Sequence, residues 1–263
     1  MGGELPSDVL GSLVDGLPGL AFAFVLVLCR TGAAVMLMPG LGEVEPPAVV
    51  RAGLALSLAV LLLPAVAPLV PGQPEAWSGL GMVGAELLAG GVLGWLARWP
   101  AIALSMAGAV ISTMMGLTSV VQPDPALGGQ SSALARLLGL LAPVLVLSTG
   151  LYGLPLSALA GSYQVVPPGA VMAAGPTAEL VQQGVTMAFG LALRLSGPFI
   201  LSGLVLQAGL GLLARLVPQL QVFSASAPGQ ILGGVLLLGA MAAPLIATWS
   251  ETMAAAWAAL PGL

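Results

Sequence analysis

Several residue types on which soluble enzymes depend are absent from this sequence or rare in it. The chain contains no histidine and no lysine, and only 6% of its 263 residues are charged. A soluble domain carries roughly 25% charged residues. Six basic and ten acidic side chains cannot cover a chain of this length with a polar surface. A water-soluble enzyme is therefore excluded.

The same absences exclude several kinds of functional site. The single cysteine, Cys29, cannot form a disulfide framework, and without histidine there is no imidazole metal site and no histidine-dependent triad. The formal net charge is −4, so no basic surface is available to bind nucleic acid. We expect no catalytic site, no metal site, no cofactor and no nucleic-acid partner.

The residues that are abundant are aliphatic. Hydrophobic residues make up 58% of the chain, together with 37 glycines and 22 prolines. Glycine and proline within long aliphatic segments are typical of packed membrane helices, whereas a disordered chain would be poor in aliphatic residues. The composition predicts an all-α membrane protein that crosses the bilayer several times.

Six apolar runs, separated by stretches rich in proline and glycine, predict about six helices. A bilayer core of about 30 Å requires roughly 20 helical residues, and three or four of the runs are longer than this. Pro100 and Pro198 fall near the middle of two long runs, which predicts kinked helices. The runs cover residues 17–38, 49–63, 80–117, 133–160, 177–217 and 231–257.

The distribution of arginine predicts the orientation in the membrane. If the N-terminus is extracytoplasmic, the outer stretches 64–79 and 161–176 contain no cation, and four arginines flank the inner loops. These four are Arg30, Arg51, Arg136 and Arg215. Because positive charge concentrates on the cytoplasmic side, we expect both termini to be extracytoplasmic.

Four charged residues interrupt otherwise apolar runs: Arg30, Glu86, Arg98 and Arg194. A charge near the bilayer centre costs about 2.5–3.5 kcal/mol on insertion scales, so each requires a partner or a watery surface. They could line an ion or proton pathway, or they could pair at a subunit interface. An arginine near a helix end could also extend to the lipid headgroups. We favour the subunit interface, because Glu86 is the only carboxylate well inside a run and a proton pump needs several.

Small residues recur at a spacing of four. In lipid, such faces allow helix backbones to approach closely, which predicts a chain that packs many helices, including those of other subunits. The sets are Gly90 with Gly94, Gly108 with Ser112 and Gly116, and Gly229 with Gly233. Met106, Met114 and Met115 precede a polar stretch, residues 118–132. Flexible methionines suit a seal that opens and closes, although ordinary packing explains them equally well.

The order of these features resembles the FliR family of export-gate proteins, in flagella and in virulence-associated type III secretion. The resemblance covers almost the whole chain. Its most specific part is Leu213-Ala214-Arg215-Leu216-Val217-Pro218-Gln219-Leu220-Gln221-Val222-Phe223, followed by Pro228. It also includes Arg30, Met38-Pro39-Gly40, Arg51 to Ser57, Glu86 with Gly90, Gly91 and Gly94, Met115-Gly116, Asp124-Pro125, Leu137-Leu138, Tyr163 and Pro167-Pro168-Gly169.

The resemblance implies an export-gate subunit with two parts. Residues 1–175 would be similar to a FliP-type subunit, and residues 176–263 would form a FliQ-like helical hairpin. A plug at about residues 113–130 would close the pore, and the tip of the hairpin would face cytoplasmic partners. The implied plug residues are Met114, Met115, Gly116, Pro123, Asp124 and Pro125. The implied contact residues of the tip are Arg215, Pro218, Gln219 and Phe223.

As a hypothesis, the chain forms a passive gate in the bacterial inner membrane, at the flagellar basal body, with FliP- and FliQ-type subunits near FlhB- and FlhA-type proteins. Unfolded substrate proteins would pass through its pore, and partner proteins would supply the energy. Of the two export systems, we prefer the flagellar one to the virulence-associated one. The alternative is a stand-alone transporter or channel for a small solute. A third possibility is a purely structural scaffold.

Overall fold

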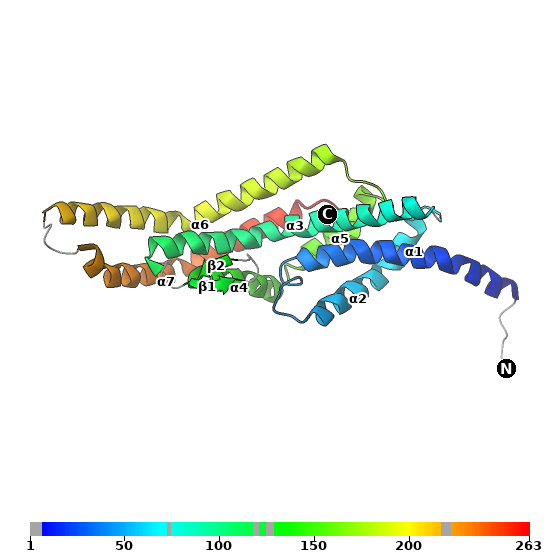
Figure 1. Ribbon diagram of the computed structural model, residues 1–263, viewed down its shortest axis with the longest axis horizontal. Helices are drawn as coiled ribbons and strands as arrows, with labels where there is room; N and C mark the ends of the chain where they lie inside the picture. The colour runs from blue at the N-terminus through cyan, green and yellow to red at the C-terminus, as the bar shows by residue number, and fades with distance from the viewer. Residues whose placement is uncertain (1–6, 73–74, 118–120, 125–128, 217–221) are drawn as a thin grey trace. The chain divides into compact units, whose positions relative to one another are not determined.

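The computed structural model describes residues 7–72, 75–117, 121–124, 129–216 and 222–263. In residues 7–16, 121–124, 129–131 and 222–225 it describes the backbone alone. The elements in chain order are α1 (Ser7–Leu37), α2 (Ala48–Val66), the short 3₁₀ helix η1 (Ala67–Leu69), α3 (Ala76–Met114), β1 (Val121–Asp124), β2 (Gly129–Ser132), α4 (Ala133–Thr149), α5 (Gly153–Val165), α6 (Ala174–Leu216) and α7 (Val222–Ala258) (Figure 1).

The helices confirm the predicted all-α membrane protein. Within the described residues, five helices are long and apolar enough to cross a bilayer, and a bent pair, α4 with α5, raises the number to as many as six. Pro100 and Pro198 lie inside the continuous helices α3 and α6. Proline is tolerated there because neighbouring helices can satisfy the backbone groups that it frees.

The run at residues 133–160, expected to be one helix, is two. α4 ends at Gly150, whose φ of 75° is the left-handed conformation of a helix C-cap, and α5 leaves at an angle of 78°. Pro155 lies in the first turn of α5, where its missing N–H removes no intrahelical bond. The glycine ends the helix, and the two prolines of the run do not.

The polar stretch before α4 contains two short strands that the sequence did not predict. β1 and β2 pair antiparallel, with Val121 opposite Ser132 and Asp124 opposite Gly129. The side chain of Ser132 then accepts a hydrogen bond from the N–H of Ala135 at 3.2 Å and so caps the N-terminus of α4. The stretch therefore contains a two-stranded antiparallel ladder, and β2 runs directly into α4.

The chain forms two compact units. The first contains residues 1–96, 153–179 and 260–263, and the second contains residues 97–152 and 180–259. Each unit includes segments from both predicted parts, 1–175 and 176–263. Those parts were defined by likeness to other proteins and not by packing, so the FliP-like and FliQ-like division stays a prediction.

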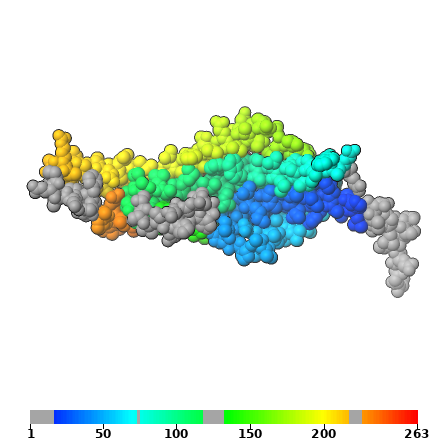
Figure 2. Space-filling model, in the orientation of Figure 1, coloured from blue at the N-terminus to red at the C-terminus, as the bar shows by residue number. Residues whose placement is uncertain are grey.

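In the first unit, α1 and α2 pack against each other around a small core of Val27, Ala59, Val66 and Tyr163. The outer face of α2 is apolar: Val49, Val60 and Leu61 are among its exposed side chains. The light-blue atoms of α2 lie at the surface in Figure 2. An exposed face of this kind is stable against lipid or against another apolar helix.

In the second unit, α7 runs antiparallel to the later part of α3. Trp257 donates its indole N–H to the carbonyl of Ala97 at 2.9 Å, and Trp249 donates to the carbonyl of Pro100 at 2.8 Å. Both indoles are fully buried. Because a proline inside a helix disrupts the backbone bonding around it, these donors give polar partners to carbonyls at the weak point of α3.

Candidate functional site

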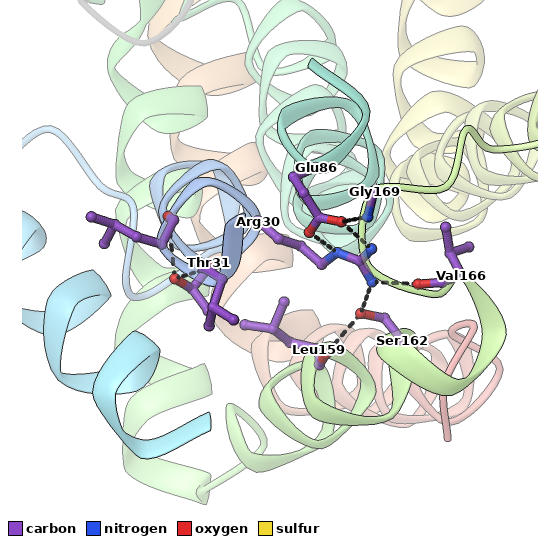
Figure 3. Close-up of polar contacts among 9 residues, drawn as sticks. Arg30, Thr31, Glu86, Leu159, Ser162, Val166 and Gly169 are labelled. Carbon is purple, nitrogen blue, oxygen red and sulfur yellow. Dashed lines mark hydrogen bonds and ion pairs between the residues drawn. The ribbon is translucent and has the colours of Figure 1, made fainter. Parts of the chain in front are cut away.

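A buried ion pair joins α1 to α3 in the first unit. The Nε of Arg30 lies 2.7 Å from Oε2 of Glu86, and its Nη2 donates to Oε1 at 2.9 Å. The two side chains are 1% and 0% exposed. Figure 3 shows the guanidinium and the carboxylate facing each other in this paired arrangement. Paired donors and acceptors of this geometry make the strongest hydrogen bonds in proteins.

The remaining polar groups of the pair bind α5 and the loop after it. Nη1 of Arg30 donates to the hydroxyl of Ser162 at 3.3 Å and to the carbonyl of Val166 at 2.9 Å. The N–H of Gly169 donates to Oε1 of Glu86 at 2.7 Å. The ring of Tyr163 lies 4.1 Å from the guanidinium carbon, which adds a cation–π contact. This network joins three helices and fixes the loop at residues 166–169.

Two glycines on α3 make the pair possible. A Cβ at Gly90 would collide with the carbonyl oxygen of Arg30, and one at Gly94 would lie 2.5 Å from the carbonyl oxygen of Ala34. The backbones of α1 and α3 therefore touch at this crossing, which places Glu86, one turn before Gly90, beside Arg30. The predicted use of this small-residue pair in helix packing is confirmed.

The other small-residue sets behave differently. A Cβ at Gly108 would lie 2.8 Å from the Cα of Ala135, so this glycine brings α3 close to α4. At Gly229 and Gly233 a Cβ would meet nothing within 4 Å. These last two glycines are therefore not helix-packing positions within the described part of this chain.

Arg30 and Glu86 were expected to bond to neighbouring subunits, and the bonds that the structure gives them lie within this chain. They bond to each other inside one unit, and the surrounding side chains leave no surface through which a neighbour could reach them. Arg98 is half-buried on α3 and Arg194 is exposed on α6. For Arg98 and Arg194 an intersubunit contact stays a prediction.

The root of the predicted plug is the end of α3 in the second unit. Met114 is the last residue of the helix, and Gly116 takes a φ of 74° that favours glycine. The two methionines fit against glycines on other helices. A Cβ at Gly203 of α6 would lie 2.9 Å from the sulfur of Met114, and one at Gly234 of α7 would lie 2.5 Å from Cγ of Met115. We call residues 114–116 the plug root.

A glutamine on α7 bonds to the plug root beside a cavity. Nε2 of Gln230 donates to the carbonyl of Met114 at 2.9 Å. The adjacent cavity has a volume of about 360 Å³. Its lining includes Met114, Met115, Phe199, Gly203, Gly233 and Gln230. Sequence reasoning did not find Gln230. The available signal was an amide in an apolar helix, which requires a polar partner at membrane depth.

The other predicted site residues have varied positions. Pro123 and Asp124 lie on β1, and Phe223 lies in the first turn of α7 and not in a loop, because that helix begins at Val222. Arg215 is exposed in the last turn of α6. Pro125, Pro218 and Gln219 lie outside the described residues. Among the described residues, no group of three acidic, histidine or cysteine side chains could hold a metal ion.

The fold, the Arg30–Glu86 network and the bond from Gln230 to the plug root define a class of protein. It is a membrane protein of several long helices, in which polar side chains join one helix to another. A model of the family described as "Bacterial export proteins, family 1" matches residues 21–256, and the chain belongs to this family. The predicted FliR-type membership is confirmed.

The relatives cover most of the chain. It is 32% identical over 231 residues to the flagellar biosynthetic protein FliR of Caulobacter vibrioides, covering 88% of this chain and 92% of the relative. It is 28% identical to FliR of Bacillus subtilis, over 87% of this chain and 88% of the relative. Yop proteins translocation protein T of Yersinia pestis is 26% identical, over 78% and 80%.

The names of these relatives are those of flagellar biosynthetic and translocation proteins, and the chain shares the export role of its family. Flagellar biosynthesis and protein translocation both occur among the relatives' names. The chain is therefore a transmembrane component of bacterial protein export.

Proposed function

We propose that this chain is a core subunit of the flagellar export gate and that, with FliP- and FliQ-type subunits, it forms the pore through which unfolded flagellar proteins leave the cell. The observation that carries the proposal is the match to flagellar relatives over nearly the whole chain. The relative named for Yop translocation is less similar, which favours the flagellar system. The same role implies an inner-membrane position at the flagellar basal body.

The plug is proposed to be residues 113–130. α3 ends inside this segment, Gly116 just after it has a positive φ, and the short β1–β2 ladder leads directly into α4. Irregular backbone at membrane depth is tolerated only where protein or a watery cavity surrounds it. A hairpin of this kind, bounded by two apolar helices, suits a pore lumen and does not suit a lipid-facing surface.

The exposed apolar surface supports a place inside an assembly. In the apolar span Ser226–Ala258 of α7, only 6% of the most apolar 18-residue stretch is buried within the chain. In water this surface would aggregate, so lipid or neighbouring helices must cover it. We propose that FliP- and FliQ-type subunits cover part of it, that both termini are extracytoplasmic, and that the α6–α7 turn faces FlhB- and FlhA-type proteins in the cytoplasm.

The test is co-expression with FliP- and FliQ-type proteins encoded beside this chain, followed by native mass spectrometry of the tagged complex. We expect a defined hetero-oligomer containing one copy of this chain, and poor recovery of the chain expressed alone. A monodisperse homo-oligomer that ignores both partners would contradict the proposal and favour a small-solute transporter. The closed Arg30–Glu86 pair argues against that alternative, since the only carboxylate well inside a predicted run is already bonded.

A further inference from the structure

We propose that Gln230 is a positioning residue that holds the plug root in its closed arrangement, and that the cavity beside it receives Met114 and Met115 when the plug moves. This inference rests on the proposed function, because it assigns the control of the plug to particular residues. We call the side-chain amide of Gln230 the latch, because it bonds to the plug root. The space that would receive the two methionines is the adjacent cavity of about 360 Å³.

The latch follows from the hydrogen bonding at the end of α3. The last four carbonyls of a helix have no intrahelical donor. Met114 ends α3, and its carbonyl receives the amide of Gln230 at 2.9 Å. In apolar surroundings neither group has a good alternative partner. Opening the plug root must therefore break or replace this one bond.

The same amide also packs against the glycine that follows the end of α3. A Cβ at Gly116 would lie 3.4 Å from Cδ of Gln230 and 3.5 Å from Nε2, so the amide group packs against this glycine. Gly116 has a positive φ, a left-handed conformation that favours glycine after a helix end. Gln230 thus contacts both the last carbonyl of the helix and the first turn of the plug, and it fixes their relative direction.

The cavity provides room for movement. Met114 and Met115 both line it, and methionine is an unbranched side chain that changes rotamer readily. The opposite wall on α7 carries Gly229 and Gly233, where a Cβ would meet nothing within 4 Å. The space is open on one side, because Gly229 and Gly233 of α7 and Leu206 of α6 are exposed. Two flexible side chains beside an open space can move into it without displacing packed atoms.

The first experiment removes the latch in the co-expressed complex. Gln230→Leu keeps the volume and removes the donor, and Gln183→Leu makes the same change on an exposed part of α6. We expect Gln230→Leu to raise the leak of small ions several-fold, measured with a membrane-potential dye, while Gln183→Leu leaves it unchanged. If Gln230→Leu assembles poorly by native mass spectrometry, Gln230→Met replaces it. If the Gln230 variant assembles and the ion leak does not rise, Gln230 is not a latch.

The second experiment fills the space. Gly233→Leu places a side chain in the cavity, and Gly239→Leu makes the same change on α7 at a position that is also open but does not line the cavity. We expect Gly233→Leu to reduce export of a reporter substrate at least tenfold without raising the ion leak, and Gly239→Leu to export normally. If Gly233→Leu and Gly239→Leu export the reporter equally well, or lose export equally, the cavity has no role in plug movement.

Deletion of residues 116–129 separates the inference from the proposed function. If the deletion leaks and Gln230→Leu does not, the plug assignment stands and the latch is wrong. If the assembled deletion does not leak, the plug assignment fails and the latch fails with it. In the third outcome, the deletion and Gln230→Leu both leak. If adding Gly233→Leu then stops the leak of Gln230→Leu but not the leak of the deletion, the latch and the cavity act on the plug as proposed.

Discussion

At the scale of single residues, the buried Arg30–Glu86 pair determines how the first unit holds together. Each charge would be costly alone, and each is paired, hydrogen-bonded to α5 or its loop, and covered. A buried pair contributes little net stability compared with apolar residues of the same shape, yet breaking it leaves an uncompensated charge. The pair therefore specifies which faces of α1, α3 and α5 meet.

This asymmetry gives a stability prediction. We expect Glu86→Leu alone to destabilise the assembled complex by about 3–5 kcal/mol, because it leaves the guanidinium of Arg30 buried without its carboxylate. The double variant Arg30→Leu/Glu86→Leu should recover a large part of this loss. The measurement is the thermal unfolding midpoint of the purified complex in detergent. A double variant as unstable as the sum of the two single variants would contradict this role.

The sequence identified both residues of the pair as requiring partners, and it could not identify the partners. Arg30 and Glu86 are separated by 56 positions, and their contact depends on the close approach of two backbones at Gly90 and Gly94. Gly90 and Gly94 were predicted to pack helices, but the spacing does not say against which helix. Gln230 was missed for a related reason, since its partner is a backbone carbonyl and carries no mark in the sequence.

At the scale of elements, the bonds from α7 to α3 organise the second unit. Two fully buried indoles and one amide on α7 reach backbone carbonyls along α3, from Ala97 to Met114. Backbone carbonyls at membrane depth cannot find water, so donors from a neighbouring helix replace it. α7 thus stabilises the helix that carries the plug root along most of its later half.

Loss of one of these donors should be measurable. Trp249→Phe keeps an aromatic ring and removes the N–H that bonds to the carbonyl of Pro100, so we expect a loss of about 1–3 kcal/mol of unfolding free energy. Trp77→Phe is the matched control, because Trp77 is 85% exposed, and its effect should stay within about 0.5 kcal/mol. Equal shifts of the unfolding midpoint in the two variants would show that the indole bond is not stabilising.

The long helices were predictable from the sequence, whereas the division of residues 133–160 into α4 and α5 and several helix boundaries were not. Long apolar runs identify helices because few other structures satisfy the backbone in lipid. Proline was a poor guide to their ends: Pro143 and Pro228 lie inside helices, and Gly150 ends one. The β1–β2 ladder was missed because four-residue strands, one of them containing Pro123, do not show the alternation that identifies a strand.

At the scale of the whole molecule, the chain consists mainly of apolar helices, and a polar stretch with the β1–β2 ladder separates α3 from α4. If this stretch is the plug proposed above, we expect deletion of residues 116–129 to make cells expressing the full complex permeable to small ions, because the flanking helices α3 and α4 remain. Ion leak and complex recovery are measured together. Loss of assembly without any leak would show that this segment builds the framework and does not close it.

α7 is unbroken from Val222 through Gln230. Pro228 lies inside this segment, two residues before Gln230, and a proline in a helix removes a backbone hydrogen bond and favours a bend. The rise of about 12 Å from Val222 to Gln230 therefore has its weak point directly before the amide that bonds to the carbonyl of Met114. A displacement of the first turn of α7 is partly absorbed at this proline, so the direction of the amide depends on the bend at Pro228 as well as on the end of the helix.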